Sequence, residues 1–361
     1  MELISFASGA TYFNTPAVGK EAAMQAIQQN QTFYGATAGT PELREVIAER
    51  YRQYNGITIT PDHILVTPGT KQALYNIIHI LLQPGDEVII PAPNWFGLHE
   101  VLEQVGAKLI VLPTDVKENY AISPELLQSY ITPRTRLFLY CNPNNPTGRI
   151  YSKTEINSWL EVLKQHPDIY VLADEIYDLV VYADEVPSLL EFPDNNQKHL
   201  VVNGFSKAFA MSGWRIGYLV TPPKLFAPCL QFQQATFSGV SEFVQAAARE
   251  VLKNAAVILP DFQNTLRQNK SQMSQFFTRL NIPFFSPQAA YYFFPDLSAF
   301  LQTEMRTTDK LASYLKEKYA LEIMPGDCFG APGYARFSFA LTPEKLNAGL
   351  TRLEEAFQKL A

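Results

Sequence analysis

The alternation of apolar strands with helical segments between residues 40 and 220 constrains the fold more than any other feature of the chain. Apolar runs typical of buried strands are separated by stretches whose apolar residues recur at helical spacing. We predict strands at 64–67, 87–91, 108–112, 136–141, 169–173, 199–202 and 216–220, and helices at 42–54, 70–82, 96–105, 124–130 and 153–165. Such a pattern is typical of a mostly parallel sheet covered on both faces, so it predicts an α/β fold.

The pattern changes after Val220. Helical segments are predicted at 241–254, 260–280 and 343–360, with further helices and with short strands at 291–294, 322–324 and 335–340. This mixture indicates an α+β region, which we interpret as a second, smaller domain.

Composition excludes several classes of protein. The 361 residues are 47% apolar and 18% charged, which is ordinary for a globular protein with a large core. The net charge of −6 argues against a nucleic-acid partner. No apolar run approaches the roughly 20 residues of a membrane span, and no signal peptide is evident. Three widely spaced cysteines fit a reducing compartment, so we expect a cytoplasmic protein. The five histidines lack metal-ligand spacing, so we expect no metal.

Lys207 occupies an unusual place, shortly after the apolar strand at 199–202. Burying an ammonium group is costly unless it is paired or neutralised, and a lysine kept partly neutral can hold a carbonyl compound as a Schiff base. Ser206 and Arg215 add a hydroxyl and a fork of donors suited to a phosphate. An amine with a phosphate grip meets the needs of pyridoxal phosphate, which carries one aldehyde and one phosphate. The alternative is a lysine in a surface loop.

Other polar residues also follow predicted strands, where ligands bind in open α/β sheets. Asp174 comes directly after an apolar strand, and a buried carboxylate requires a cationic partner. A protonated pyridine nitrogen would serve, although a salt bridge or a helix cap would also explain it. Gly69, Thr70 and Lys71 open a helix, where free amides favour an anion.

Four motifs give the chain a family resemblance. They are 203–218 around Lys207, Asn-Pro-Asn-Asn-Pro-Thr-Gly at 142–148, Ala-Asp-Glu-Ile-Tyr at 173–177 and Tyr-Ala-Arg-Phe-Ser at 334–338. In this order they resemble the class I/II aminotransferases, fold-type I enzymes that use pyridoxal phosphate, and the bacterial aspartate aminotransferase subgroup most. The resemblance runs from about Ser8 to the end of the chain.

The resemblance implies an architecture. It comprises a large cofactor-binding domain at 31–255, with a mostly parallel seven-stranded sheet flanked by helices, and a smaller α+β domain at 1–30 and 256–361. It also implies a homodimer, in which Tyr34 reaches the phosphate in the neighbouring subunit's site.

The resemblance assigns catalytic roles to three residues. Lys207 would hold the cofactor and move the proton between the substrate Cα and the cofactor. Asp174 would pair with the pyridine nitrogen, while Glu175 is expected to have a supporting or structural role. Tyr177 and Asn145 would donate to the phenolic oxygen of the cofactor and lower the pKa of the Schiff base.

Binding roles follow in the same way. Trp95 would stack on the pyridine ring, and Gly69, Thr70, Ser206 and Arg215 would hold the phosphate. Arg336 would grip the substrate α-carboxylate, with help from Asn145. Lys71 would border the cofactor site and bind a distal substrate carboxylate, as in one subgroup of aspartate aminotransferases. A core tryptophan, an internal salt bridge at Arg336 and a solvent-facing Lys71 are the structural alternatives.

The chain departs from the family pattern at its substrate side. The loop that begins at Gly9 lacks the usual acidic residues and first proline, although this loop lines the substrate entrance in the family. Asn94 stands where an aromatic residue is common. No helix precedes the Gly9 loop, so we expect a less extensive dimer.

We therefore predict an aminotransferase that moves an amino group from an L-amino acid to a 2-oxo acid. Aspartate or glutamate with 2-oxoglutarate is the first choice of substrates, on the strength of Lys71. Aromatic or methionine-like donors, or a carbon–sulfur β-lyase, are the alternatives. A non-catalytic regulator would need a DNA-binding region that the sequence lacks, and a Schiff-base aldolase would not need Asp174 and Arg215.

Overall fold

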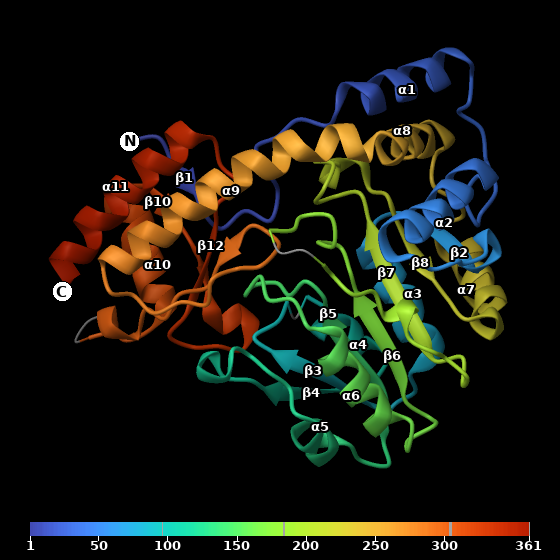
Figure 1. Ribbon diagram of the computed structural model, residues 1–361, viewed down its shortest axis with the longest axis horizontal. Helices are drawn as coiled ribbons and strands as arrows, with labels where there is room; N and C mark the ends of the chain where they lie inside the picture. The colour runs from blue at the N-terminus through green and yellow to red at the C-terminus, as the bar shows by residue number, and fades with distance from the viewer. Residues whose placement is uncertain (96, 183–184, 303–304, 361) are drawn as a thin grey trace.

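The computed structural model describes residues 1–95, 97–182, 185–302 and 305–360. Its larger part is built on a seven-stranded sheet with the order β2-β8-β7-β6-β5-β3-β4 (Figure 1). The strands are β2 Ile64–Thr67, β3 Glu87–Ala92, β4 Lys108–Pro113, β5 Thr135–Cys141, β6 Tyr170–Asp174, β7 His199–Gly204 and β8 Gly217–Val220. Strand β8 is antiparallel to β2 and β7, and the other neighbours are parallel. The prediction of an α/β fold with a mostly parallel sheet is confirmed.

Each face of this sheet has its own apolar core, because successive side chains of a strand point to opposite faces. In β6, Val171 packs in one core and Leu172 in the other. The first core includes helices α2 Pro41–Asn55, α5 Pro124–Tyr130 and α6 Lys153–Leu163. The second includes α3 Thr70–Leu81, α4 His99–Gln104 and α7 Pro223–Thr236. Covering both faces leaves the carboxyl ends of the parallel strands open to form a site.

The C-terminal part contains two small sheets. Strands β11 Met324–Pro325, β12 Ala335–Ser338 and β9 Tyr292–Phe293 form an antiparallel sheet in that order. Strand β1 Ile4–Ser5 pairs in parallel with β10 Leu321–Glu322. Helices α9 Ala255–Arg279, α10 Thr308–Tyr319 and α11 Pro343–Leu360 surround them, and α9 runs from the larger part to the smaller one (Figure 1).

The N-terminal segment contacts both parts of the molecule. Strand β1 joins the C-terminal part, whereas helix α1 Ala17–Gln28 packs against α8 Glu242–Lys253. Gly19 permits this close approach, because a Cβ placed there would lie 2.6 Å from Cγ1 of Val251. The segment at 1–30 is thus shared between the two parts, and the division into domains at 31–255 and 256–361 stays a prediction.

Several elements differ from the predicted pattern. Helices α1, α7 and α10 were not given bounds by the sequence pattern, and α7 carries Pro228 in its interior, which obscures its periodicity. The helix predicted at 96–105 is observed as α4 from His99 to Gln104, and Phe96 lies outside the described residues.

Candidate active site

A cavity of about 620 Å³ lies at the carboxyl ends of the central strands. It receives residues from the loops after β6 and β7, from the start of α3 and from the C-terminal part. The residues singled out from the sequence that line it are Gly9, Thr70, Lys71, Trp95, Asn145, Asp174, Tyr177, Ser206, Lys207, Arg215 and Arg336. Ala7, Cys141, Tyr292, Met324, Cys328 and Phe329 also line it, and the sequence pattern had not marked them as site residues.

Lys207 projects its amine into this cavity from the loop after β7. Its Nζ donates a hydrogen bond of 2.7 Å to the carbonyl of Gly9, which also accepts one of 2.8 Å from the Tyr291 hydroxyl. The amine lies 5.7 Å from the ring centre of Tyr177. Among the described residues no carboxylate forms an ion pair with it, so the amine is available to a ligand.

Asp174 ends β6 and is buried, and one of its oxygens accepts a hydrogen bond of 3.1 Å from the Ile176 amide. Burial raises the pKa of its carboxyl to about 6, while that amide and the positive charge of Lys207 oppose the rise. A buried carboxylate in this state favours a cationic partner.

Tyr177 and Tyr292 meet across the cavity, with their hydroxyl oxygens 2.8 Å apart. Tyr177 follows β6, and Tyr292 lies in β9 of the C-terminal part. Burial raises the pKa of the Tyr177 phenol, so it stays a donor at neutral pH. The adjacent pair of tyrosines in an apolar strand was the only sequence signal for Tyr292.

Arg336 enters the cavity from β12 and is almost fully buried. Its Nη1 donates to Oδ1 of Asn145 at 3.1 Å, and its Nη2 donates to the carbonyl of Ala7 at 2.7 Å. Its Nε is buried with no partner among the described residues. The guanidinium also lies 4.3 Å from the ring centre of Tyr292. Among the residues that the structure describes, no carboxylate forms the internal salt bridge considered as the alternative. A buried guanidinium without a carboxylate suits an anionic ligand.

The start of α3 faces Arg215. Gly69 has φ of 84°, and a Cβ there would lie 2.5 Å from Nη2 of Arg215, so only glycine permits this approach. Arg215 donates to the carbonyl of Ser212 at 2.8 Å, and Thr70 and Ser206 line the same cavity. Amides, hydroxyls and a guanidinium together form a typical phosphate site.

Comparison with known proteins identifies the family of the chain. Residues 1–353 match the family described as aminotransferase class I and II. The chain belongs to this family. It is 32% identical to a probable aspartate/prephenate aminotransferase of Aquifex aeolicus, covering 100% of this chain and 92% of that protein. It is 34% identical to a bifunctional aspartate and glutamate/aspartate-prephenate aminotransferase of Petunia hybrida, covering 98% and 76%.

Solved structures give the same result. Aspartate aminotransferase from Thermus thermophilus with maleate superimposes with a TM-score of 0.93 at 32% identity, covering 100% of this chain and 92% of that one. Aromatic aminotransferase from Pyrococcus horikoshii has a TM-score of 0.94 at 29% identity, with 99% and 96% covered. The chain is therefore an aminotransferase, and its cofactor is pyridoxal phosphate.

The residues of the aminotransferase cavity fit this cofactor. Lys207 offers an amine for its aldehyde, Asp174 a buried carboxylate for its ring nitrogen, and Arg215 with the start of α3 a grip for its phosphate. No comparison tests the roles of individual residues, so these assignments remain predictions.

Trp95 and Lys71 both line the cavity, with the Lys71 amine 5.5 Å from the Trp95 ring centre. Asn94 is fully buried and does not line the cavity. Its Oδ1 accepts from the Trp95 amide at 2.7 Å and from Sγ of Cys141 at 3.3 Å. The expected effect of Asn94 on the substrate side therefore acts through the positions of residues that line the cavity, Trp95, Cys141 and Phe329, whose carbonyl accepts from the Asn94 amide at 3.1 Å.

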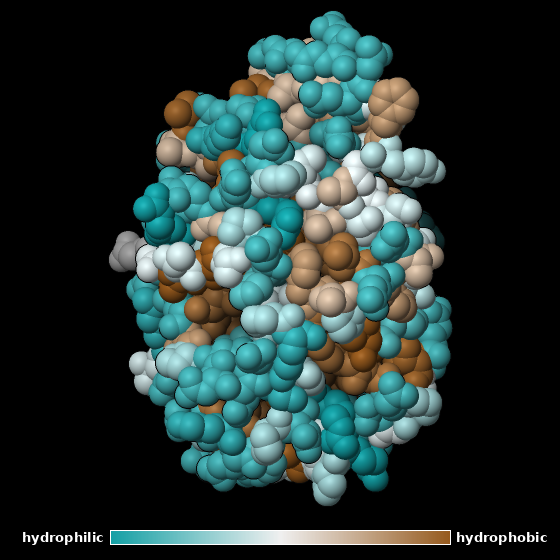
Figure 2. Space-filling model, turned by 90° about the vertical axis from the view of Figure 1, so that its right-hand side faces the viewer, coloured by the Kyte–Doolittle hydropathy of each residue, from teal (hydrophilic) through white to brown (hydrophobic). Residues whose placement is uncertain are grey.

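Tyr34 lies outside the cavity. Its side chain is 98% exposed, and the neighbouring Phe33 is 80% exposed. Figure 2 looks onto the side of the molecule that carries α1, α2 and α7, where brown apolar patches interrupt a mostly teal surface. Met24, Ile27 and Phe237 are further exposed apolar residues. An exposed apolar surface of this kind is typical of a contact with another protein chain.

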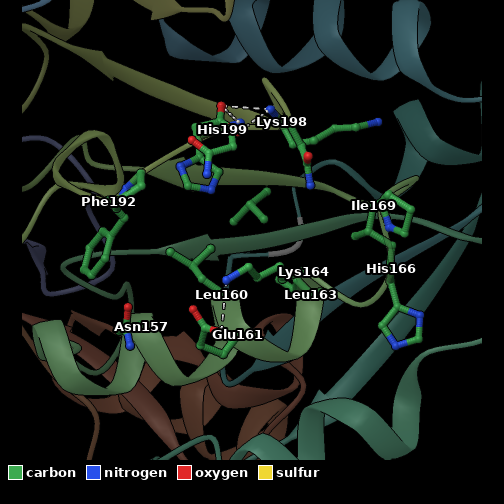
Figure 3. A pocket seen from close by; sticks show the side chains of 16 residues that line it. Asn157, Leu160, Glu161, Leu163, Lys164, His166, Ile169, Phe192, Lys198 and His199 are labelled. Atoms are coloured by element: carbon green, nitrogen blue, oxygen red, sulfur yellow. Dashed lines mark hydrogen bonds and ion pairs between the residues drawn. The ribbon is translucent and has the colours of Figure 1, made fainter.

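A second cavity, of about 650 Å³, lies away from these residues (Figure 3). It is bordered by α6, by the start of β6 and by the segment from Phe192 to His199. None of the predicted site residues lines it, so size alone does not identify the active site.

The described residues contain no group of three or more His, Cys, Asp or Glu that could hold a metal ion. Within those same residues, no helix has both the length and the apolar character needed to cross a membrane.

Proposed function

We propose that the aminotransferase uses a dicarboxylic amino donor, aspartate or glutamate, with 2-oxoglutarate as the acceptor. The observation that carries this proposal is the presence of two cations, Arg336 and Lys71, in one cavity besides the Lys207 amine and the phosphate-directed Arg215. Two carboxylates on one substrate require two cationic partners when they leave water. Relatives named aspartate/prephenate aminotransferases and the Thermus enzyme solved with maleate, a dicarboxylate, support it.

Each residue then has a task. Pyridoxal phosphate, when bound, supplies an aldehyde for the amino group and a ring that stores electrons. Arg336 and Asn145 bind the substrate α-carboxylate and so orient the bond from Cα to hydrogen. The Nζ of Lys207 takes the proton from Cα as a general base and later returns a proton as an acid. Asp174 keeps the ring nitrogen protonated, because its negative charge favours that proton.

Tyr177 completes the cavity. Its buried phenol would donate a hydrogen bond to the phenolic oxygen of the cofactor. The Tyr292 hydroxyl, 2.8 Å from the Tyr177 oxygen, fixes the position of that phenol. Phe329, Tyr292 and Trp95 line the cavity with aromatic rings, whose low polarity strengthens charged contacts beside them.

A test of the substrate uses single amino acids without an oxo acid. Protein loaded with pyridoxal phosphate is mixed separately with aspartate, glutamate, phenylalanine, methionine and cystathionine, and its absorbance is followed. Conversion to the pyridoxamine form by aspartate or glutamate supports the proposal. Conversion only by phenylalanine or methionine would replace it with an aromatic or thioether donor, and release of pyruvate and ammonia from cystathionine with the β-lyase.

The contribution of Lys71 is tested by Lys71→Met, which keeps the length of the side chain and removes the charge. We expect kcat/KM for aspartate to fall about 10- to 100-fold, the cost of one charge-assisted contact, and that for phenylalanine to stay within about twofold. Lys164→Met, an exposed lysine far from the cavity, is the control. An equal loss for both donors would assign Lys71 to the cofactor rather than to the substrate.

We also propose that the aminotransferase is a homodimer in which Tyr34 reaches the partner's cavity. The exposure of Phe33 and Tyr34, and of Met24 and Ile27 on α1, supports this arrangement. A Tyr34→Phe variant that weakens cofactor binding in a dimer of unchanged mass would agree with it, whereas a monomer with full activity would refute it. The three free cysteines support a cytoplasmic location, since the cytoplasm keeps thiols reduced.

A further inference from the structure

The segment from Asp174 to Asp178 presents its acidic residues to two different environments. Asp174 and Tyr177 line the active-site cavity, whereas Glu175 and Asp178 do not. Asp178 instead lies in a mostly buried polar cluster outside the cavity, in contact with Arg50 and Asn203. The residue that follows Tyr177 is thus held by groups that do not line the active-site cavity.

Asp178 joins three elements that are far apart in the sequence. Arg50, from α2, forms an ion pair with Oδ2 of Asp178 through its Nη2. Asn203, near the end of β7, donates to the same oxygen from Nδ2 at 2.8 Å. The Oδ1 of Asn203 in turn accepts from the Gly204 amide at 2.7 Å, in the segment that leads to Lys207. One carboxylate therefore links the loop of Tyr177 to the loop of Lys207.

Arg50 is the fixed point of this cluster. Its residue is only 4% exposed, its Nη1 donates to the Tyr218 hydroxyl at 3.3 Å, and its guanidinium lies 4.5 Å from the ring centre of Tyr51. A planar guanidinium held by an aromatic ring and two acceptors has little freedom to move. It can therefore hold Asp178 in one place.

Glu175 adds a second carboxylate to the same region. It accepts hydrogen bonds from the Ser188 hydroxyl at 3.0 Å and from the Leu189 amide at 2.8 Å. Its charge and that of Arg50 attract each other. Glu175 and Asp178, at the two ends of this segment, are thus held by contacts outside the cavity, while Tyr177 between them lines the cavity.

We propose that Arg50 is a positioning residue for transamination: through Asp178 and Asn203 it fixes the Tyr177 phenol relative to the Lys207 amine. The inference rests on the roles proposed above for Tyr177 and Lys207. The physical reason is that a shift of about 1 Å between reacting groups can cost up to about 100-fold in rate. Because Arg336 and Asn145 lie outside the cluster, binding of the substrate carboxylate does not depend on it.

The test compares Arg50→Lys with the double variant Arg50→Met and Asp178→Asn, which removes both charges of the ion pair together. Arg44→Met is the matched control, because Arg44 is also on α2 but bonds to Pro61, Ile64 and Asp62. For each variant loaded with pyridoxal phosphate, the measurements are the cofactor Kd, the pH midpoint of the cofactor's absorbance change, kcat, KM and Tm.

We expect the double variant to raise the pH midpoint, because a displaced Tyr177 no longer stabilises the cofactor's phenolate. We expect its kcat to fall about 10- to 100-fold with KM within about twofold, and Arg50→Lys to recover part of both changes. Arg44→Met should lower Tm and leave the midpoint unchanged.

An unchanged midpoint in both Arg50 variants would overturn the proposal and make the cluster purely structural. If the double variant does not fold, Arg50→Lys decides by the same midpoint. Failure of the proposed function would look different. In that case Lys207→Ala would leave the cofactor's absorbance as it is in the unsubstituted protein, whatever Arg50 does.

Discussion

The active-site cavity and the second cavity differ in how their polar groups are satisfied, although their volumes, about 620 and 650 Å³, are nearly equal. In the active-site cavity the guanidinium of Arg336 lacks a carboxylate and its Nε lacks any partner among the described residues. In the second cavity Glu161 pairs with Lys164 at 3.4 Å, and Asp194 accepts from the Lys198 amide at 2.8 Å (Figure 3).

His199, in the second cavity, has a ring nitrogen without a partner among the described residues. This nitrogen, Nδ1, is buried, and burial lowers the pKa of the imidazole, so the ring is neutral at neutral pH. Burying a neutral ring nitrogen without a hydrogen bond costs far less free energy than burying an unpaired guanidinium. Unsatisfied charge, rather than volume, therefore distinguishes the candidate active site from the second cavity.

Among the substitutions in the two cavities, replacing Lys207 should lower catalytic activity the most. We expect Lys207→Ala to lower kcat by about 10⁴-fold or more, because the variant loses both the covalent hold on the cofactor and the proton carrier. The measurement is the single-turnover rate with aspartate. Lys224→Ala, an exposed lysine that bonds to the Asn196 carbonyl, is the control and should keep full activity. A Lys207→Ala variant within tenfold of the unsubstituted enzyme would contradict the assignment.

Asp174→Asn should have the next largest effect. The amide keeps the shape but cannot hold the ring nitrogen in its protonated form, so we expect kcat to fall about 10²- to 10³-fold. The absorbance of the bound cofactor should also change, since the charge beside its ring is lost. Cofactor binding with an unaltered spectrum and rate would show that Asp174 acts only as a structural group.

Arg336→Lys tests the unpaired guanidinium. Lysine keeps the charge but loses the fork that contacts Asn145 and Ala7, so we expect KM for aspartate to rise about 10- to 100-fold. The expected change in kcat is smaller, because Lys207 and Asp174 are untouched. Steady-state kinetics measure both values. A loss confined to kcat would place Arg336 in the chemical step instead of in carboxylate binding.

Much of this contrast could be predicted from the sequence, because it depends on local patterns. Apolar runs followed by polar residues mark the strand ends near Asp174 and Lys207. The same kind of run predicts the strands of the large sheet. The motif around Arg336 marked the guanidinium that the structure places opposite Asn145.

Other features depend on contacts between distant segments and left no local pattern. Tyr292 meets Tyr177 across 115 positions of sequence, and the Ala7 carbonyl reaches Arg336 across 329. In the sequence, Arg50 resembles any other charged residue of an amphipathic helix. Only the structure shows its ion pair with Asp178. Such pairs arise from tertiary packing, which single-sequence periodicity does not describe.

The pH dependence of stability follows from the two buried carboxyls. Burial raises the pKa of Asp174 to about 6 and that of Glu175 to about 7, above the ordinary values of about 4 that apply in the unfolded chain. The folded state therefore binds more protons than the unfolded chain between about pH 4 and 7, and these groups lower its stability as the pH rises through this window.

The free energy of unfolding of the cofactor-free protein should decrease between pH 5 and pH 8. In Glu175→Gln we expect this decrease to be smaller by about 2 kcal/mol. Urea unfolding at several pH values measures it. Glu161→Gln, an exposed glutamate of the second cavity, is the matched control and should leave the slope unchanged. A slope that Glu175→Gln does not alter would mean that Arg50 keeps this carboxylate ionised throughout.

The smallest effect is expected at the second cavity. Lys164→Ala removes an exposed ion pair with Glu161, and exposed pairs contribute little because water screens them. We expect kcat/KM for aspartate within twofold of the unsubstituted enzyme and a free energy of unfolding within about 0.5 kcal/mol. Steady-state kinetics and urea unfolding check the two values. A clear loss of activity without a loss of stability would show that this cavity is coupled to the active site, and the distinction drawn from unsatisfied charge would then be incomplete.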